Sequence, residues 1–487
     1  MLKVMCPKKE LLLEPNITRP NHRNLSVQLT EQKKILATVD GLLVLVALLL
    51  GLWLGARRSG WDFSFELILV YSPWFFAVIG LYFVLATAND AYRPRTFTDP
   101  AASFVALVKT IIQIILLYLL VYFLLPPRSL PRHFIGFFAV ISPFLLLGWH
   151  RLYTLAFAIS AFQRRAIVVG GGWAGRTIVK TLTDFAPTHY EIIGFVDDDP
   201  AKQQSTIQGV PVLGPTSGLV DLAQNRGATD VVLAINHDLQ GEVLANILTC
   251  YEQGLQVSTM PELYEDLTDR VPVEHIGNNW FVVLPLDTQG RNLSYRIVKR
   301  ALDLVISLIS LTLFALLLPL LAALIKLDTP GPVFYRQKRV GRAGREFELL
   351  KLRSMFTDAE QDGQAKWAEQ YDKRVTRVGL FLRRTRLDEL PQLVNIVRGE
   401  MSLVGPRPER PEFVAELQQE IPFYRTRLTV KPGLTGWAQV NYDYGRSVTD
   451  ALEKLRYDLY YIKHQSIQLD LIILLKTIST ILLLKGT

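Results

Sequence analysis

Hydrophobic residues are concentrated in long blocks near the N-terminus. A helix of ~20 apolar residues is long enough to cross a bilayer, and four segments reach that length. They cover residues 35–56, 67–88, 104–125 and 134–156. We therefore predict four transmembrane helices within residues 35–160, preceded by a polar, disordered cytoplasmic tail over residues 1–34.

Basic residues beside these segments predict the orientation of the bundle. Lysines and arginines favour the cytoplasmic side, and they flank the tail, the second loop and the exit of the fourth helix. This places the N-terminus inside, and an even number of spans keeps the rest of the chain inside as well. Few ionisable side chains lie within the four segments, so an anchor is favoured over a transport path.

A second pattern follows over residues 163–286. The string RRAIVVGGGWAGRTIVKTL indicates a strand, a glycine turn and a helix, and Gly170, Gly172 and Gly175 match G-x-G-x-x-G. Such a turn brings backbone N–H groups close to an anion. A second predicted strand ends at Asp197, and further strands are expected near 229–235 and 255–260. We predict a Rossmann-like α/β domain.

Dinucleotide chemistry is not favoured for this domain. About 120 residues leave little room for a substrate domain, and the Tyr-x-x-x-Lys pair of extended reductases occurs only at Tyr295–Lys299, where it opens a hydrophobic run. We expect a structural or regulatory role. One hypothesis is that the glycine turn and Asp197 bind a uridine nucleotide as a regulator.

A fifth uncharged run covers residues 304–325 and admits two interpretations. It could cross the membrane, but basic residues flank both ends, which favours two cytoplasmic ends. Pro319 lies late in the run, and proline kinks a helix. A helix over about 296–327 that enters the membrane and returns to the same face satisfies both observations. The last apolar stretch, 469–484, is short and indicates an interfacial helix, with a buried core helix as the alternative.

Composition adds a charge asymmetry. Of the 487 residues, 49% are hydrophobic, and the formal net charge is +8. Residues 1–290 carry −2 and residues 291–487 carry +10. A basic C-terminal unit suits an anionic partner such as phosphate, nucleic acid or anionic lipid. Two cysteines exclude a disulfide scaffold, and seven histidines show no zinc spacing.

The densest chemical pattern is the string LDELPQL. Adjacent carboxylates at Asp388 and Glu389 precede Pro391, which suits the first turn of a helix. Repulsion between them calls for a cation, either a metal or a nearby arginine such as Arg386 or Arg407. Such a pair often does no more than cap a helix. A carboxylate can also attack phosphorus directly, with Mg²⁺ bound by oxygen ligands and shared with a diphosphate.

Residues 291–487 resemble the bacterial polyprenyl-phosphate hexose-1-phosphate transferases. The resemblance rests on KRALDL, YRQKRVG, LKLRSM, LDELPQL, RGEMSLVGPRP and KPGLTGWAQVN. The whole layout resembles the large members of this family, with four spans, a Rossmann-like domain and a C-terminal α/β catalytic domain that contains a re-entrant membrane helix.

The resemblance implies a two-step reaction that starts exopolysaccharide, capsule or O-antigen synthesis. Asp388 would attack the β-phosphate of a UDP-hexose and expel UMP, and the sugar phosphate would then pass to undecaprenyl phosphate. Glu389 would assist, and Mg²⁺, or Mn²⁺ in its place, would bind at Asp388. The side chains expected at substrate phosphates are Lys351, Arg353, Arg384, Arg386, Arg407, Lys431 and Gln439.

The same resemblance implies an inner-membrane enzyme in contact with membrane lipids, a homodimer, and no nucleic-acid partner. Two other classes were weighed. A nucleotide-sugar oxidoreductase or dehydratase would use the Rossmann-like domain, and a membrane scaffold or chain-length regulator would need no catalysis. The oxidoreductase or dehydratase is disfavoured because the Rossmann-like domain lacks the Tyr-x-x-x-Lys pair. The non-catalytic scaffold is disfavoured because the Asp388–Glu389 dyad is intact. No motif distinguishes glucose from galactose as the sugar.

Overall fold

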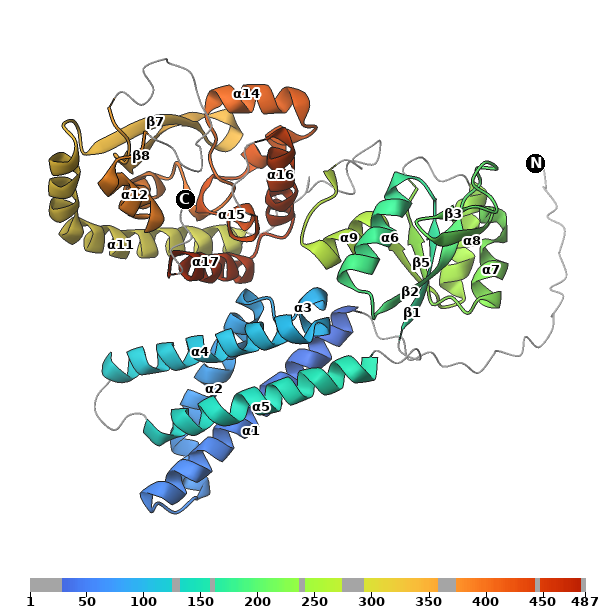
Figure 1. Cartoon of the computed structure of the whole chain (residues 1–487), viewed down its shortest axis with the longest axis horizontal. Helices are drawn as coiled ribbons and strands as arrows, with labels where there is room; N and C mark the ends of the chain where they lie inside the picture. The colour runs from blue at the N-terminus through green and yellow to red at the C-terminus, as the bar shows by residue number, and fades with distance from the viewer. Residues whose placement is uncertain are drawn as a thin grey trace, which may run out of the picture.

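The computed structural model describes residues 29–124, 132–157, 163–235, 241–273, 293–357, 374–442 and 447–482. Figure 1 shows three units in chain order: a helical bundle in blue and cyan, a green sheet flanked by helices, and a C-terminal unit running from yellow to red. The predicted tail lies outside the described residues up to position 28, as does the end of the predicted middle domain from position 274.

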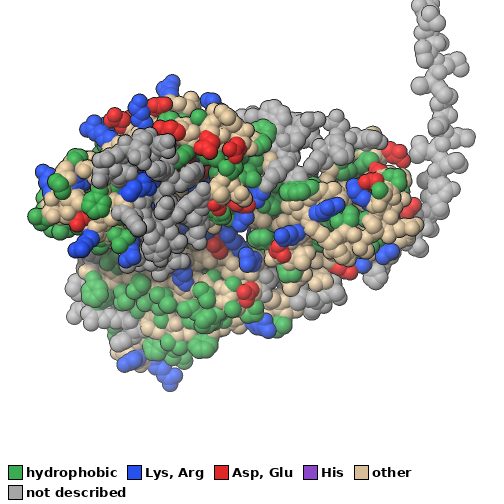
Figure 2. Space-filling model, turned by 45° about the horizontal axis from the view of Figure 1, so that its top comes forward, with side chains coloured by type: hydrophobic (Ala, Val, Ile, Leu, Met, Phe, Trp, Pro, Cys, Tyr) green, Lys and Arg blue, Asp and Glu red, His purple; other side chains and the backbone are tan. Residues whose placement is uncertain are grey.

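The four predicted apolar segments are confirmed as long helices. Each is long and apolar enough to cross a membrane, and apolar side chains gather over the lower part of the surface in Figure 2, where the bundle lies. The N-terminal helices are α1 (Leu29–Ser59), α2 (Phe65–Ala88), the short α3 (Pro94–Thr98), α4 (Pro100–Leu124) and α5 (Arg132–Phe157).

A polar cluster ties this bundle together from within. The buried Asp40 of α1 accepts a hydrogen bond from the Tyr82 hydroxyl at 2.8 Å, and His150 Nε2 lies 3.1 Å from its carboxylate. His150 Nδ1 reaches Ser103 Oγ on α4 at 3.1 Å. All four helices therefore share one hydrogen-bonded network, and the satisfied partners explain how a carboxylate is tolerated there.

The middle unit is confirmed as a doubly wound α/β sheet. Its strand order is β3-β4-β2-β1-β5-β6, parallel except for the β3–β4 pair. One apolar layer contains side chains of α6 and α9, and the other contains those of α7 and α8. The elements are β1 (Arg164–Val169), α6 (Trp173–Phe185), β2 (Tyr190–Val196), β3 (Thr206–Ile207), β4 (Val210–Gly214), η2 (Thr216–Gly218), α7 (Leu219–Asn225), β5 (Asp230–Leu233), α8 (Gly241–Glu252), β6 (Gln256–Thr259) and α9 (Met260–Thr268).

The C-terminal unit is built of short strands and helices around one core. An antiparallel hairpin, β7–β8, lies over the helical segment that carries the Asp-Glu pair, and β9 pairs with β10 in parallel. The elements are α11 (Leu293–Asp328), β7 (Phe334–Val340), η4 (Arg342–Gly344), β8 (Glu346–Leu352), α12 (Arg377–Arg384), η5 (Leu387–Gln392), α13 (Leu393–Arg398), β9 (Ser402–Val404), α14 (Pro411–Glu420), η6 (Tyr424–Thr429), β10 (Gly433–Thr435), α15 (Trp437–Asn441), α16 (Val448–Lys463) and α17 (Ile467–Leu482).

Helix α11 contains the fifth apolar run, and both of its ends are attached to this same unit. Near its start, Arg300 Nη1 donates to the Ile396 carbonyl at 2.7 Å. At its end, Asp328 Oδ2 accepts the Val378 N–H at 3.0 Å. Pro319 lies inside the helix, which turns a corner before reaching β7 (Figure 1). A helix anchored at both ends to one body is the arrangement that a returning path requires.

The Tyr295–Lys299 pair has a structural role. The Tyr295 hydroxyl and the Lys299 ammonium both bind Asp470 of α17, at 3.0 and 2.9 Å. These bonds fix α17 against α11.

Helix α17 is buried on part of its surface. Its Ile473 is fully buried in the C-terminal core, and Lys476 reaches Asp90, beyond the end of α2, at 2.8 Å. Leu471 and Ile478 of the same helix are 41% and 52% exposed. The contact with Asp90 is one that the local sequence does not show, and the interfacial helix stays a prediction.

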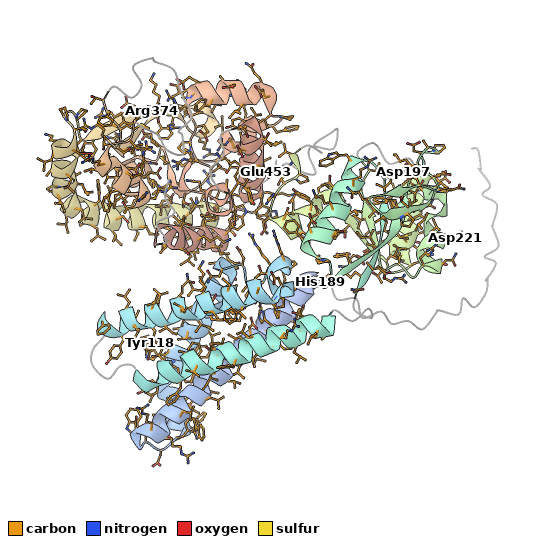
Figure 3. The ribbon with its side chains drawn as sticks, in the orientation of Figure 1. Tyr118, His189, Asp197, Asp221, Arg374 and Glu453 are labelled. Carbon is orange, nitrogen blue, oxygen red and sulfur yellow. The ribbon has the colours of Figure 1, made fainter. Side chains whose placement is uncertain are left out.

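The three units meet at ionic contacts. Arg93, between α2 and α3, binds Asp269 just after α9 at 2.7 Å. Glu265 of α9 is held by Lys463 at 2.9 Å, and Glu453, labelled between the units in Figure 3, binds Arg270 at 3.3 Å. The middle unit is thus joined to both the bundle and the C-terminal unit.

Candidate active site

Asp388 and Glu389 lie in η5, a 3-10 segment that leads into α13. The pair was expected at the start of a regular helix, and the structure places it one turn earlier, in tighter geometry. Arg386 precedes it with φ of 59°, a left-handed conformation uncommon for a residue with a side chain. The two carboxylates are 6% and 7% exposed. Burial of two adjacent carboxylates is costly, so cations or hydrogen-bond donors are needed nearby to stabilise their negative charge.

Three cations converge on one oxygen of Glu389. Its Oε1 lies 2.8 Å from Arg407 Nη2, 3.1 Å from Lys351 Nζ and 3.7 Å from Arg386 Nη1. Each cation comes from a different segment: the 405–408 turn, β8 and the start of η5. Glu389 is therefore a buried, ionised anchor that draws these segments together.

Asp388 has a different environment from its neighbour. Within the described part of the chain, its carboxylate has no hydrogen bond or ion pair. Burial raises its pKa, and the Glu389 charge raises it further, while Lys351 and Arg383 act in the opposite direction. For Glu389, burial opposes ionisation, but Arg407 and Lys351 outweigh it and hold the pKa well below the usual range. Neighbouring carboxylates with pKa values driven apart are typical of catalytic pairs.

The position of Lys351 depends on a buried asparagine. Asn395 of α13 is fully buried, and its side chain accepts the Leu350 N–H at 3.2 Å and donates to the Glu348 carbonyl at 2.7 Å. These bonds complete the free edge of β8 beside Lys351. The pairing fixes the strand relative to the helix that follows the dyad.

Four of the predicted phosphate-binding residues do not lie at the dyad. Arg353 follows β8, which ends at Leu352, so it does not share a strand face with Lys351. Its buried guanidinium instead donates to the Thr329 and Pro330 carbonyls at 2.6 and 2.7 Å. This corrects the sequence-based assignment: Arg353 closes the end of α11. Arg384 ends α12 with an exposed side chain.

Lys431 and Gln439 are also placed away from Glu389. A Cβ atom added to Gly399, at the far end of α13, would lie 3.6 Å from Lys431 Nζ and 3.7 Å from Arg300. Burial and the Arg300 charge lower the pKa of Lys431. Gln439 donates to the Leu434 carbonyl at 3.2 Å within its own turn. Neither residue contacts the dyad, because the KPGLTGWAQ segment folds back on itself.

Of the two carboxylates of the dyad, only Asp388 is suited to bind a metal ion. Among the described residues, no group of three or more His, Cys, Asp or Glu side chains could hold a metal. Mg²⁺ is commonly held by one or two carboxylates together with substrate phosphates and water. The Asp388 oxygens have no partner in the described structure, whereas Glu389 is engaged by cations. Asp388 is therefore the side chain that suits this ion.

In the glycine turn of the middle unit, a backbone N–H is occupied by a carboxylate of the same chain. Gly170 has φ of 104°, and a Cβ at Gly175 would lie 2.0 Å from the Gly170 carbonyl oxygen, so both positions require glycine. Gly172 caps α6. The Gly171 N–H, which would face a phosphate in a dinucleotide site, donates to Asp197 Oδ2 at 2.6 Å (Asp197 is labelled in Figure 3). A ligand phosphate would compete with this carboxylate.

Three residues near the site were not predicted from the sequence. They are Arg383, whose charge acts on Asp388, Asn395 behind β8, and Arg427, which donates to the Arg407 carbonyl at 3.0 Å. None belongs to a chemical pattern along the chain. Of the three, only Asn395 could have been noticed in the sequence, as a polar residue among the apolar positions of a helix.

Two family models match the chain. One described as bacterial sugar transferase matches residues 294–483, and one described as CoA-binding domain matches residues 87–261. The first covers both α11 and the Asp-Glu pair. The second begins in the last turn of α2 and ends at the start of α9.

Three similar proteins are all named as enzymes that transfer a sugar phosphate to undecaprenyl phosphate. The UDP-N-acetylgalactosamine-undecaprenyl-phosphate N-acetylgalactosaminephosphotransferase of Aeromonas hydrophila is 39% identical, covering 60% of this chain and 67% of its own. The undecaprenyl-phosphate glucose phosphotransferase of Komagataeibacter xylinus is 35% identical, covering 65% and 58%. The UDP-glucose:undecaprenyl-phosphate glucose-1-phosphate transferase of Escherichia coli (strain K12) is 30% identical, covering 88% and 91%. The names differ in the sugar.

Proposed function

The chain belongs to the bacterial sugar transferase family and is a transferase, and from this we propose that it moves a hexose 1-phosphate from a UDP-hexose to undecaprenyl phosphate. The products are undecaprenyl-diphospho-hexose and UMP. The observation that carries the proposal is the asymmetric dyad: a buried Asp388 without a partner in the described structure, beside a Glu389 held by three cations. The lipid-linked sugar would start exopolysaccharide, capsule or O-antigen synthesis.

We propose that Asp388 is the nucleophile. Its carboxylate oxygen attacks the β-phosphorus of the UDP-hexose, and the bond from that phosphorus to the oxygen bridging the two phosphates breaks, so that UMP leaves. The undecaprenyl phosphate oxygen then attacks the same phosphorus, and the bond to Asp388 breaks, restoring the carboxylate. A carboxylate surrounded by little water is a stronger nucleophile than a hydrated one, and its raised pKa supports the role.

Lys351, Arg386 and Arg407 have two tasks in this proposal. They keep Glu389 ionised, and as cations grouped beside the dyad they would attract the diphosphate of the substrate. Arginine suits phosphate because its planar fork offers paired donors. We also propose Mg²⁺, or Mn²⁺ in its place, at Asp388, where the ion would neutralise charge on the diphosphate.

UMP release tests the reaction. Purified protein with Mg²⁺ is supplied with a panel of UDP-sugars, with and without undecaprenyl phosphate, and Asp388→Asn serves as the matched control. We expect lipid-dependent UMP from one sugar, and stoichiometric UMP without lipid if the covalent intermediate forms. Full activity of Asp388→Asn would remove the nucleophile assignment, and turnover in EDTA would remove the metal. No UMP from any donor would count against the whole proposal.

We further propose that the protein lies in the bacterial inner membrane with α11 re-entrant and both globular units on the cytoplasmic side. The attachment of both ends of α11 to one unit supports this path. Single cysteines at positions 299 and 328 should be labelled from the same side of the membrane, and labelling from opposite sides would show a plain fifth span. The homodimer implied by the resemblance is also a proposal, and light scattering in detergent would test it.

A further inference from the structure

The turn at residues 405–408 is held by its carbonyl groups. Pro406 and Pro408 have no backbone N–H, so only two of the four residues in the turn can donate a backbone hydrogen bond. The carbonyls of Pro406, Arg407, Pro408 and the following Glu409 instead each accept a hydrogen bond, from Gly433 N, Arg427 Nη2, Arg339 Nη1 and Val340 N, at 2.9, 3.0, 3.1 and 2.9 Å. The turn is therefore fixed from three separate segments.

Arg427 is the only one of these donors that acts on the peptide of Arg407 itself. It lies in η6, is 6% exposed, and also donates to the Tyr424 hydroxyl at 2.5 Å. Its Nη2 forms an ion pair with Asp458 Oδ2 of α16 at 2.9 Å, and its Nη1 lies 4.0 Å from Glu409. Asp458 is 1% exposed.

Burying the Arg427–Asp458 ion pair costs desolvation energy, and an apolar pair of the same size would fill the core equally well. The ion pair therefore points to a role beyond filling the core. Buried ion pairs are often no more stabilising than apolar residues of the same size. Here one fork spans Asp458, Tyr424 and the Arg407 carbonyl at the same time, and Arg407 Nη2 lies 2.8 Å from Glu389 on the other side of the turn. The chain of contacts runs from α16 to the dyad in three steps.

We propose that Arg427, held by Asp458, is a positioning residue for the transfer reaction. By fixing the Arg407 peptide, it keeps the Arg407 guanidinium on Glu389 and so sets the charge beside Asp388. The inference rests on the proposed function. Arg427 makes no hydrogen bond or ion pair with the dyad among the described contacts; it acts through Arg407.

The expected effect follows from what Glu389 loses. The charged groups that face Glu389 are Asp388, Lys351, Arg386 and Arg407, and Arg407 makes the shortest contact. If Arg407 moves away, the Glu389 carboxylate loses this contact and a cation leaves the surroundings of Asp388. Transfer should then slow, mainly in kcat.

The variants are Arg427→Gln, Arg427→Lys and Asp458→Asn, with Arg425→Gln as the control. Arg425 lies on the same segment and makes an exposed contact with Gln418. We expect Arg427→Gln to lower kcat/KM for the UDP-hexose about 10- to 100-fold, mainly in kcat. Lysine retains the charge but loses the fork, so Arg427→Lys should recover only part of the activity.

A readout independent of turnover separates this inference from the proposed function. In hydrogen-exchange mass spectrometry of the full-length protein, a peptide over 401–410 should exchange at least about tenfold faster in Arg427→Gln and Asp458→Asn than in Arg425→Gln. Equal exchange would overturn the positioning role, even if the wild type released no UMP. A folded Arg427→Gln with wild-type kcat/KM, or with activity reduced only in proportion to its folded fraction, would overturn it as well.

Discussion

The two carboxylates of the dyad should respond oppositely to loss of charge. Asp388→Asn keeps the shape of the side chain and removes a buried charge that has no partner in the described structure and that repels Glu389. Burial and Glu389 both disfavour the Asp388 charge, so its removal should stabilise the protein, by about the 0.5–2 kcal/mol that single stabilising substitutions commonly give. Glu389→Gln would instead leave three cations facing a neutral amide, and breaking a buried ion pair costs about 3–5 kcal/mol.

The assay is thermal unfolding of the full-length protein in detergent, with activity measured in parallel. For Asp388→Asn we expect transfer to be abolished while the apparent Tm rises by about 2–4 °C, the shift that ~1 kcal/mol gives in a unit of this size. For Glu389→Gln we expect a lower Tm and little activity. Leu390→Met, a volume-conserving change at the next residue, is the matched control.

The dependence on pH follows from the opposite pKa shifts. Because the folded-state pKa of Asp388 is raised, its cost to stability is absent below the unfolded value of ~3.9, grows as the pH rises toward the folded value and is complete above it, so the advantage of Asp388→Asn should shrink as the pH falls. Because the folded-state pKa of Glu389 is lowered, its stabilisation is complete above its unfolded value of ~4.3 and is lost as the pH falls through the folded value. An Asp388→Asn variant that melts below the wild type at neutral pH would refute this reasoning.

Three further outcomes are expected. Asn395→Leu should lower the Tm and reduce kcat several-fold, because the Leu350 N–H and the Glu348 carbonyl of β8 each lose a hydrogen bond; an unchanged kcat would contradict its part in placing the strand. Asp197→Ala should free the Gly171 N–H, so that a thermal-shift titration with UMP or UDP responds more strongly than in the wild type, and no response in either protein would remove the regulatory nucleotide site. Lys476→Met should destabilise the junction with Asp90 by about 1–3 kcal/mol, less than a fully broken pair because Arg93 also contacts that carboxylate at 3.1 Å; an unchanged Tm would show that the contact between units contributes nothing.

The order of the units and their element types could be predicted from the sequence. Long uninterrupted apolar runs can be satisfied only as membrane or deeply buried helices, so four of them suffice to predict the bundle. Gly170 and Gly175 are required by local backbone geometry, and that requirement is visible in the spacing of the strand, turn and helix. The Asp-Glu pair was found because arginines lie on both sides of it in the sequence, at a predicted helix start.

The tertiary structure alone decided which charges meet. Lys351, Arg386 and Arg407 reach one oxygen of Glu389 from segments up to 56 residues apart, whereas Arg353, two positions from Lys351, faces the end of α11. A short-range pattern fixes the direction of a side chain only while the strand continues, and β8 ends between these two residues. The roles of α17, Asn395 and Arg427 were hidden for the same reason: each acts on a partner distant in the chain, and packing, not local sequence, brings the two together.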